Sequence, residues 1–329
     1  MKKIAVDMMG SDLGPEELKK GLLRFAEECP DYSFILFGEK SKLDTLFASD
    51  DRFEIRNTSE VIPMEIDPMS FLRKKDSSMY QAITSVKEKK ADGVISAGST
   101  AGLVVGSTFL LKNIDGVSRA GLCSPFPTVD YNKPATILDI GASLINTKED
   151  LLSFALMGRA YAKEVLKIED PKVYLLSNGT EEGKGSKEGR EAYQLFKEKN
   201  YLWFKGNCEA REALDGKHDV IITSGYAGNI FLKATEGMGK NMSSLIKKAF
   251  KKNIFTKIGY LFAKKGFDEL SRTMDYKRFG GAIFLGVNGV VIKAHGNSDE
   301  YGFYSALKVC RNMIEADIVT KIKKQVQDE

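Results

Sequence analysis

The chain has 329 residues, of which 43% are apolar and 29% are charged, a composition typical of a soluble protein with a large core. A formal net charge of +4 is too small to indicate nucleic-acid binding, so we expect no nucleic-acid partner. The four cysteines lack the spacing of a zinc site, the first apolar run is too short for a signal peptide, and no apolar run approaches the about 20 residues of a membrane span. These features predict a reduced, cytoplasmic protein without a metal.

Apolar strands and amphipathic helices alternate along the chain. The predicted strands are residues 3–7, 32–37, 53–57, 93–96, 119–123, 135–140, 172–177, 219–223, 282–286 and 289–294. The predicted helices are residues 15–28, 78–91, 101–113, 148–167, 187–199, 227–251 and 300–325. This alternation predicts a three-layer α/β/α fold with a mostly parallel sheet. No linker rich in Pro, Ser or Gly divides the chain, so we expect one compact unit over residues 1–329, with a two-lobed arrangement as the alternative.

Residues 239–267 differ from the rest because they include no acidic residue. Lysines and apolar residues recur there at a spacing of three to four, which predicts a protruding pair of amphipathic helices broken near Asn253. Such a basic insertion can attach to an anionic membrane surface, or its apolar faces can pack on each other or on a partner subunit. The residues expected at the contact with the membrane or with an acidic protein partner are Lys247, Lys248, Phe250, Lys251, Lys252, Ile254, Phe255 and Lys257.

Glycines and small polar residues follow most of the predicted strands. Because the carboxyl ends of parallel strands meet at one edge of a sheet, and helix N-termini favour anions, we expect a phosphate- or carboxylate-bearing substrate there. Hydroxyl groups near two helix starts are candidates for an anion site, or they serve only as helix caps. They belong to Ser77, Ser78, Ser96, Ser99 and Thr100.

Four further polar residues lie in or near such turns. Lys184 lies between two glycines and can neutralise a phosphate or an oxyanion, or it is a solvated surface lysine. Asn229 and Lys233 open the helix after strand 219–223, where Asn229 can donate to a substrate oxygen or cap the helix. His295 at a strand end is a candidate base or a structural histidine. The glycine-rich residues 179–189 nearly match a Walker A loop and a dinucleotide fingerprint, but their spacing fits neither.

Taken together and in this order, eight segments resemble the PlsX family, the acyl-acyl carrier protein:phosphate acyltransferases. The segments are Ile4–Pro15, Arg73–Met79, Ile95–Thr100, Leu138–Ala142, Glu181–Gly185, Gly225–Gly237, Gly280–Ala282 and Val291–Asp299. The resemblance covers nearly the whole chain. It implies transfer of a fatty acyl group from acyl-acyl carrier protein to inorganic phosphate, giving acyl phosphate for phospholipid synthesis.

The resemblance also implies a fold like that of the isocitrate/isopropylmalate dehydrogenases and phosphotransacetylases, a homodimer, and peripheral attachment to the membrane. No metal and no cofactor are implied, and a downstream glycerol phosphate acyltransferase is an expected partner. Lys184 and Asn229 are the expected catalytic residues. The expected phosphate- or substrate-binding residues are Asp7, Asp12, Ser77, Ser78, Ser96, Ser99, Thr100, Asp139, Lys233 and His295.

The chain departs from the family pattern at four positions. The family usually has Asn where this chain has Ser99 and Ser143, Gly at Ser11, and Asp at Ser224. The change from Asn to Ser shortens the reach of a polar group, and the change from Asp to Ser removes a charge. One alternative is therefore a catalytically weak homologue that binds the carrier protein and the membrane as a scaffold. Another alternative is a dehydrogenase of the same fold.

Overall fold

The computed structural model describes residues 1–47, 50–130, 132–273 and 280–329, and the side chains of residues 268–273 are not described. Its strands are β1 (Lys2–Asp7), β2 (Tyr32–Gly38), β3 (Phe53–Asn57), β4 (Gly93–Ser96), β5 (Gly121–Phe126), β6 (Ala135–Leu138), β7 (Val173–Ser177), β8 (Phe204–Glu209), β9 (Val220–Ile222), β10 (Ala282–Leu285) and β11 (Val290–Lys293). Its helices are α1 (Pro15–Glu28), α2 (Lys40–Leu46), α3 (Pro68–Arg73), α4 (Ser78–Lys87), α5 (Thr100–Leu111), α6 (Lys148–Glu164), α7 (Lys187–Glu198), α8 (Gly225–Phe250), α9 (Ile254–Thr273), α10 (Glu300–Glu315) and α11 (Ile318–Asp328).

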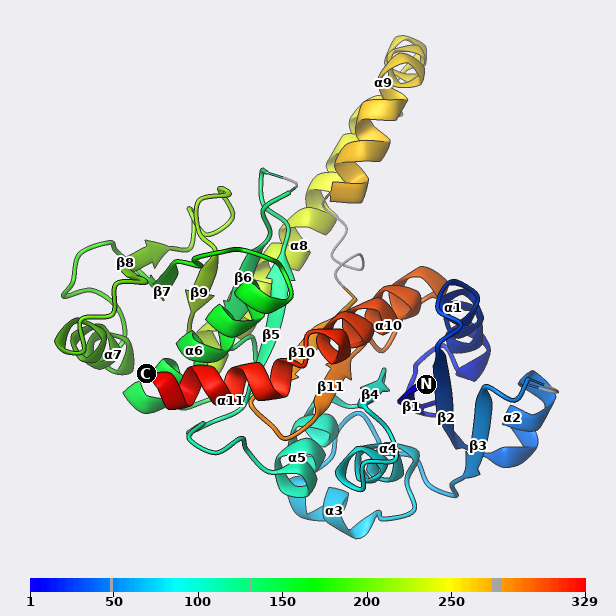
Figure 1. The fold of residues 1–329 in the computed structure, drawn as a ribbon. Helices are drawn as coiled ribbons and strands as arrows, with labels where there is room; N and C mark the ends of the chain where they lie inside the picture. The colour runs from blue at the N-terminus through cyan, green and yellow to red at the C-terminus, as the bar shows by residue number, and fades with distance from the viewer. Residues whose placement is uncertain (48–49, 131, 274–279) are drawn as a thin grey trace.

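All of these strands belong to one sheet in the order β3-β2-β1-β4-β11-β10-β5-β6-β9-β7-β8 (Figure 1). Strand β10 runs antiparallel to both β11 and β5, and β5 runs antiparallel to β6, whereas the other pairs are parallel. The predicted mostly parallel α/β sheet is therefore confirmed. The parallel pairing brings the carboxyl ends of β1, β4 and β11 to the same edge.

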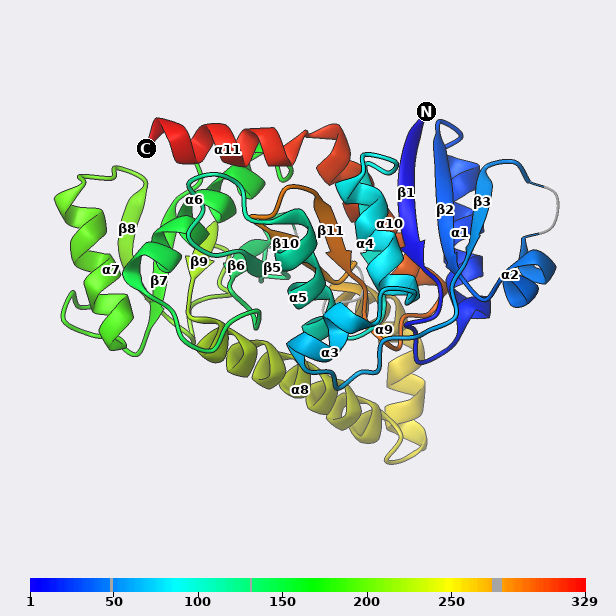
Figure 2. The same ribbon diagram turned by 90° about the horizontal axis from the view of Figure 1, so that it is seen from below.

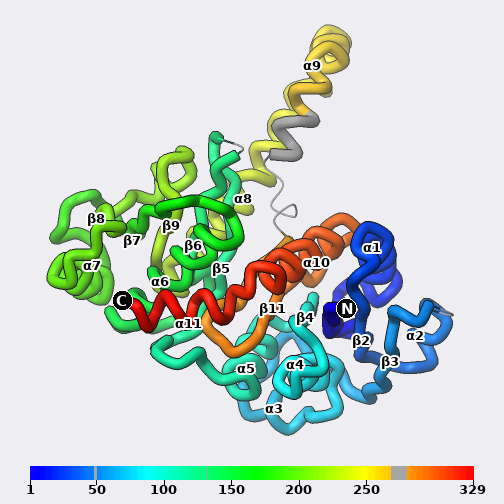
Figure 3. Tube along the Cα trace, in the orientation of Figure 1, coloured from blue at the N-terminus to red at the C-terminus, as the bar shows by residue number. Residues whose placement is uncertain are grey.

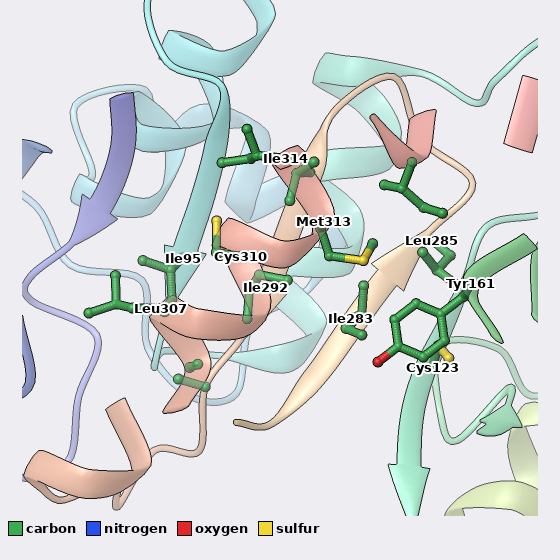
Figure 4. Close-up of a cluster of buried hydrophobic side chains, with 14 of the residues drawn as sticks. Ile95, Cys123, Tyr161, Ile283, Leu285, Ile292, Leu307, Cys310, Met313 and Ile314 are labelled. Atoms are coloured by element: carbon green, nitrogen blue, oxygen red, sulfur yellow. The ribbon is translucent and has the colours of Figure 1, made fainter. Parts of the chain in front are cut away.

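The core divides into two layers, one on each face of the sheet. One layer contains the apolar faces of α1, α6 and α10, and Figure 4 shows Leu307, Cys310 and Met313 of α10 near strand residues such as Ile292. The other layer contains Phe71 of α3 and apolar residues of α4 and α5, with the first turns of α8 packed against it. Figure 2 shows α11 on one side of the sheet and α8 on the other. This is the predicted three-layer arrangement.

Helices α8 and α9 lie side by side and extend away from the sheet (Figures 1 and 3). The predicted break is confirmed, because α8 ends at Phe250 and α9 begins at Ile254. The Asn253 side chain accepts a hydrogen bond from the backbone N–H of Thr256 at 2.9 Å, as a helix cap does. Most of α8 is solvent-exposed, and only Gly225 and Gly228 in its first turn are buried.

Some elements differ from those predicted. Residues 300–325 do not form one helix, because Asp317 adopts a left-handed conformation (φ 47°) that ends α10 and precedes α11. The short helices α2 and α3 and the edge strand β8 were not predicted. Strand β8 escapes prediction because Lys205, Gly206 and Asn207 interrupt its apolar alternation.

Candidate active site

A cavity of about 720 Å³ lies where α5, β5, α8 and the end of β11 meet. Much of its wall is apolar, and this part includes Val104, Val105, Leu122, Phe126, Ile140 and Leu232. The lining also includes polar side chains, among them Thr100, Asn229, Lys233, Glu236, Lys293 and His295. The cavity therefore offers both an apolar surface and a group of positive and hydrogen-bonding side chains.

Four of the residues predicted for the site line this cavity: Thr100, Asn229, Lys233 and His295. Asn229 packs directly on the turn after β6, since a Cβ atom on Gly141 would lie 3.1 Å from its side-chain nitrogen. Gly141 has a φ of 136°, which a side chain rarely allows. The glycine therefore lets the Asn229 amide approach the backbone closely.

Asp139 organises this turn rather than lining the cavity. Its buried carboxylate accepts hydrogen bonds from the N–H groups of Leu122, Gly141, Ala142 and Ser143 and from the Ser143 hydroxyl, at 2.8–3.1 Å. Burial raises the pKa of Asp139, and the bonds from Ala142 and Gly141 oppose that rise. A Cβ atom on Gly228 would lie 1.9 Å from the Asp139 carbonyl oxygen, so the start of α8 is in close contact with this turn.

Asp7 is a second buried carboxylate and receives two of the hydroxyl groups predicted for the anion site. Ser78 and Ser96 each donate to Asp7 at 2.6 Å. The hydroxyl of Ser77 donates to the Lys74 carbonyl, and that of Ser99 donates to the Met64 carbonyl, both at 2.7 Å. These four hydroxyl protons are donated within the protein in this structure, so phosphate binding by the serines stays a prediction.

Lys293, at the end of β11, lines the cavity but was not predicted as a site residue. Burial lowers the pKa of its ammonium to about 8, and the carboxylates of Asp12 and Asp7 oppose that lowering. The ammonium donates to the carbonyl oxygen of Ala294. Its sequence signal was its place inside the segment Val291–Asp299, two residues before His295, but there it reads as an ordinary strand residue.

The structure does not bring Lys184 into this cavity. Lys184 is exposed in the loop between β7 and α7, outside the lining residues. Its backbone N–H donates to the Glu181 carbonyl at 3.0 Å, and the N–H of Gly185 donates to the Asn178 side chain at 2.9 Å. The loop is thus internally hydrogen-bonded, and the catalytic role of Lys184 stays a prediction.

The serines that depart from the family pattern all have local hydrogen bonds. Ser224 caps α8 by accepting from Ala227 at 3.4 Å, and Ser99 caps α5 by accepting from Gly102 at 3.2 Å. Ser143 donates to Asp139, as described above, and Ser11 donates to the Gly296 carbonyl at 3.2 Å. Serine is as good an N-cap as aspartate, so the change at position 224 keeps the start of α8 capped.

The α8–α9 pair half-buries some aromatic side chains and exposes others. Phe250 packs on Tyr260 and Phe267, with ring centroids 5.4 and 4.7 Å apart. On the outside, Phe255 and Phe262 are 81% and 88% exposed. None of the described helices combines the length and hydropathy needed to cross a bilayer. In the same part of the chain, no group of three or more His, Cys, Asp or Glu side chains is arranged to hold a metal ion.

Comparison with known proteins identifies a family and a fold. Residues 2–321 match the family described as fatty acid synthesis protein. The phosphate acyltransferase of Mesoplasma florum is 41% identical over 99% of this chain and 100% of its own length. That of Lactococcus lactis subsp. cremoris is 40% identical over 99% of both chains. Among solved structures, a phosphotransacetylase from Streptococcus pyogenes superposes with a TM-score of 0.57 at 18% identity, covering 100% of this chain and 94% of its own.

Proposed function

This chain belongs to the fatty acid synthesis protein family, and from that premise we propose that it transfers a fatty acyl group from acyl-acyl carrier protein to inorganic phosphate, giving acyl phosphate. The broader activity follows from the family and the relatives: the protein is an acyltransferase of fatty acid and phospholipid synthesis. The proposal concerns the donor, the acceptor and the product.

The observation that carries the proposal is the mixed lining of the 720 Å³ cavity. An acyl phosphate has an anionic head and an apolar chain. Lys233, Lys293 and Asn229 provide positive charge and a hydrogen-bond donor for the head, and the apolar wall between α5 and α8 suits the chain.

In the proposed reaction, a phosphate oxygen attacks the thioester carbonyl carbon and forms a C–O bond. The resulting tetrahedral intermediate collapses by breaking the C–S bond, and the carrier-protein thiolate leaves and takes up a proton. The Asn229 amide donates to the developing oxyanion, while Lys233 adds positive charge. Phosphate is already an anionic nucleophile at neutral pH, so positioning alone can supply up to about 7–11 kcal/mol. A catalytic role for Lys184, which would neutralise the phosphate or the oxyanion, is proposed from the family resemblance.

The α8–α9 pair fits the proposed peripheral contact with an anionic membrane and with the acidic carrier protein. Exposed Phe255 and Phe262 can enter the interface, and each lysine near an anionic leaflet contributes about 1 kcal/mol. We expect binding to vesicles to rise with anionic lipid, to fall with salt, and to drop when Lys247, Lys248, Lys251 and Lys252 are changed to Glu. Equal binding to neutral and anionic vesicles would contradict an electrostatic anchor.

The long exposed face of α8 also suits the expected homodimer, and a glycerol phosphate acyltransferase is the expected consumer of the product. Sedimentation of the purified protein tests the dimer separately from the membrane contact. If the lysine-to-Glu changes abolish vesicle binding but leave the dimer intact, membrane contact and dimer formation depend on different residues.

The decisive experiment incubates the purified protein with acyl-acyl carrier protein, with and without phosphate, and detects acyl phosphate directly by mass spectrometry. We expect free carrier protein and acyl phosphate to appear together, and only with phosphate. In Asn229→Ala we expect both signals to fall by about 10²–10³. Carrier-protein release that is equally fast without phosphate would contradict the proposed acceptor, and binding of the carrier protein without turnover would favour the scaffold alternative.

A further inference from the structure

Lys293 lies in a row with two other polar residues at the carboxyl edge of the sheet. It is in register with Ser96 on β4, which is in register with Asp7 on β1. Partners in parallel strands point to the same face, and side chains two residues apart share a face. Ala5, Val94 and Val291, two residues earlier in each strand, all belong to the core layer beneath α3, α4 and α5. The Lys293 side chain is therefore directed to that face, where the cavity lies.

The charges around Lys293 leave it without a full counterion. Asp7 and Asp12 attract it, and Lys233 repels it. The side-chain hydrogen bonds to the Asp7 carboxylate come from the hydroxyl groups of Ser78 and Ser96, so Asp7 attracts Lys293 by its charge without a hydrogen bond between them. Among the described residues, the ammonium donates to the neutral carbonyl of Ala294, which uses one of its three protons. A cation in such surroundings is stabilised strongly by an anionic ligand, because burying a charge without a partner is costly.

The other two lysines of the cavity, Lys233 and Lys240, are less available, because both are exposed to solvent. Lys233 forms an ion pair with Glu236 at 3.1 Å, and its side chain is 68% exposed. An anion that binds Lys233 competes with that ion pair and with solvent, whereas Lys293 is less exposed and is influenced by Asp7 and Asp12 without a direct ion pair among the described residues. Thr100, the first residue of α5, a helix of 12 residues, belongs to the same lining, and the N-terminus of a helix favours anions.

We propose that Lys293 is the principal cation that binds the inorganic phosphate substrate in this cavity, with Lys233 contributing from a second wall. This inference rests on the proposed function, because it names the residue that holds the acceptor of that reaction. It assigns the phosphate to the end of β11 and not to the loop of Lys184. The acyl chain would then extend from this point along the apolar wall formed by α5 and α8.

The test compares the wild type with Lys293→Met and Lys293→Arg, and uses Lys205→Met, an exposed position on β8 at the far edge of the sheet, as the control. Inorganic phosphate is titrated calorimetrically without an acyl donor. A hydrogen bond to a charged group is worth enough that its loss weakens binding about tenfold or more. We expect that loss in Lys293→Met, partial retention in Lys293→Arg, and no change in Lys205→Met.

Steady-state kinetics then distinguish two phosphate groups that Lys293 could bind: inorganic phosphate, and the phosphate of the prosthetic group that carries the acyl chain on the carrier protein. We expect Lys293→Met to raise the KM for inorganic phosphate about tenfold or more while the KM for acyl-acyl carrier protein stays within about twofold. A rise in the carrier-protein KM alone would assign Lys293 to the phosphate of the carrier's prosthetic group and overturn the proposal. An unchanged KM for inorganic phosphate in a folded Lys293→Met variant would also overturn the proposal. If the calorimetric titration of the wild type gives no measurable heat, the KM for inorganic phosphate is the test.

The same data distinguish this inference from the proposed function. If the wild type binds phosphate through Lys293 but forms no acyl phosphate, the proposed reaction fails and the binding site stands. If the wild type forms acyl phosphate and Lys293→Met retains the wild-type phosphate KM, the reaction stands and the assignment of Lys293 fails. Thermal unfolding of each variant confirms that it is folded before either reading is made.

Discussion

Changing Lys293 to Met should make the protein more stable while it weakens phosphate binding. The pKa of Lys293 is lowered from 10.5 to about 8 by burial, and each pKa unit corresponds to about 1.4 kcal/mol. Below pH 8 the lysine is protonated in both the folded and the unfolded chain, so the folded state carries the full cost of about 3 kcal/mol. Lys293 keeps some exposure toward the cavity, so this value is an upper bound.

The lost hydrogen bond to Ala294 offsets about 1 kcal/mol, which leaves a net gain of about 2 kcal/mol at pH 7. For a chain of 329 residues, this gain raises Tm by about 3 °C. Between pH 8 and 10.5 the unfolded chain binds more protons than the folded one, so the free energy of unfolding of the wild type rises with pH relative to that of the variant. The stability difference between the two proteins therefore becomes smaller.

Calorimetric unfolding in phosphate-free buffer at pH 7 and at pH 10 measures this difference, with Lys205→Met as the control for loss of a lysine charge. A Lys293→Met variant that is less stable at pH 7 would refute the reasoning. A stabilisation of equal size at both pH values would assign the effect to methionine packing and not to the buried charge. A stabilisation at pH 7 that becomes smaller at pH 10 would show that the fold tolerates a destabilising cation, as functional sites often require.

Three further predictions concern the cavity and the start of α8. Asn229→Ala should lower turnover by about 10²–10³ with normal unfolding, because one preorganised donor is lost; a parent-like rate would remove Asn229 from the mechanism. Gly228→Ala should destabilise the protein by about 1–3 kcal/mol in denaturant unfolding, because a Cβ atom would lie 1.9 Å from the Asp139 carbonyl oxygen. Its control, Gly237→Ala on the same helix, meets no atom within 4 Å and should stabilise by up to about 1 kcal/mol. Finally, the KM for phosphate should rise as pH passes about 8, where Lys293 loses its proton, and Lys293→Arg should abolish that rise; a rise that persists in Lys293→Arg would assign the titration to another group.

The fold was largely predictable because its signals are local. Alternating apolar strands and amphipathic helices are written in the order of residues, and the break at Asn253 follows from a residue that can cap the next helix. The missed elements have weaker local signals. Asp317 ends α10 in a left-handed conformation, although nothing in the periodicity of residues 300–325 marks that position. Strand β8 is held mainly by its pairing with β7.

The site was only partly predictable because burial and partner choice are tertiary properties. Ser78 and Ser96 have the sequence features of an anion-binding turn, yet both donate to the buried Asp7 carboxylate, which needs donors in the absence of water. Their spacing gives no sign of this, since Asp7 is far away in the chain. Thr100 and Asn229 both line the cavity, because each lies near the start of a helix that follows a strand of the sheet, and their roles in binding or catalysis stay predictions.

Lys293 shows why a lysine at a strand end can be overlooked. In sequence it is one of many lysines, and an isolated lysine is usually solvated. Its distinction arises when β11 inserts between β4 and β10, so that the ammonium lies over a core layer with Asp7 and Asp12 nearby. A buried lysine without a direct ion pair is stabilised when an anionic ligand binds next to it. A lysine that already forms an ion pair gains much less from such a ligand. The cost of burying Lys293 and its capacity to bind phosphate therefore have the same physical origin, and a variant that removes one should remove the other.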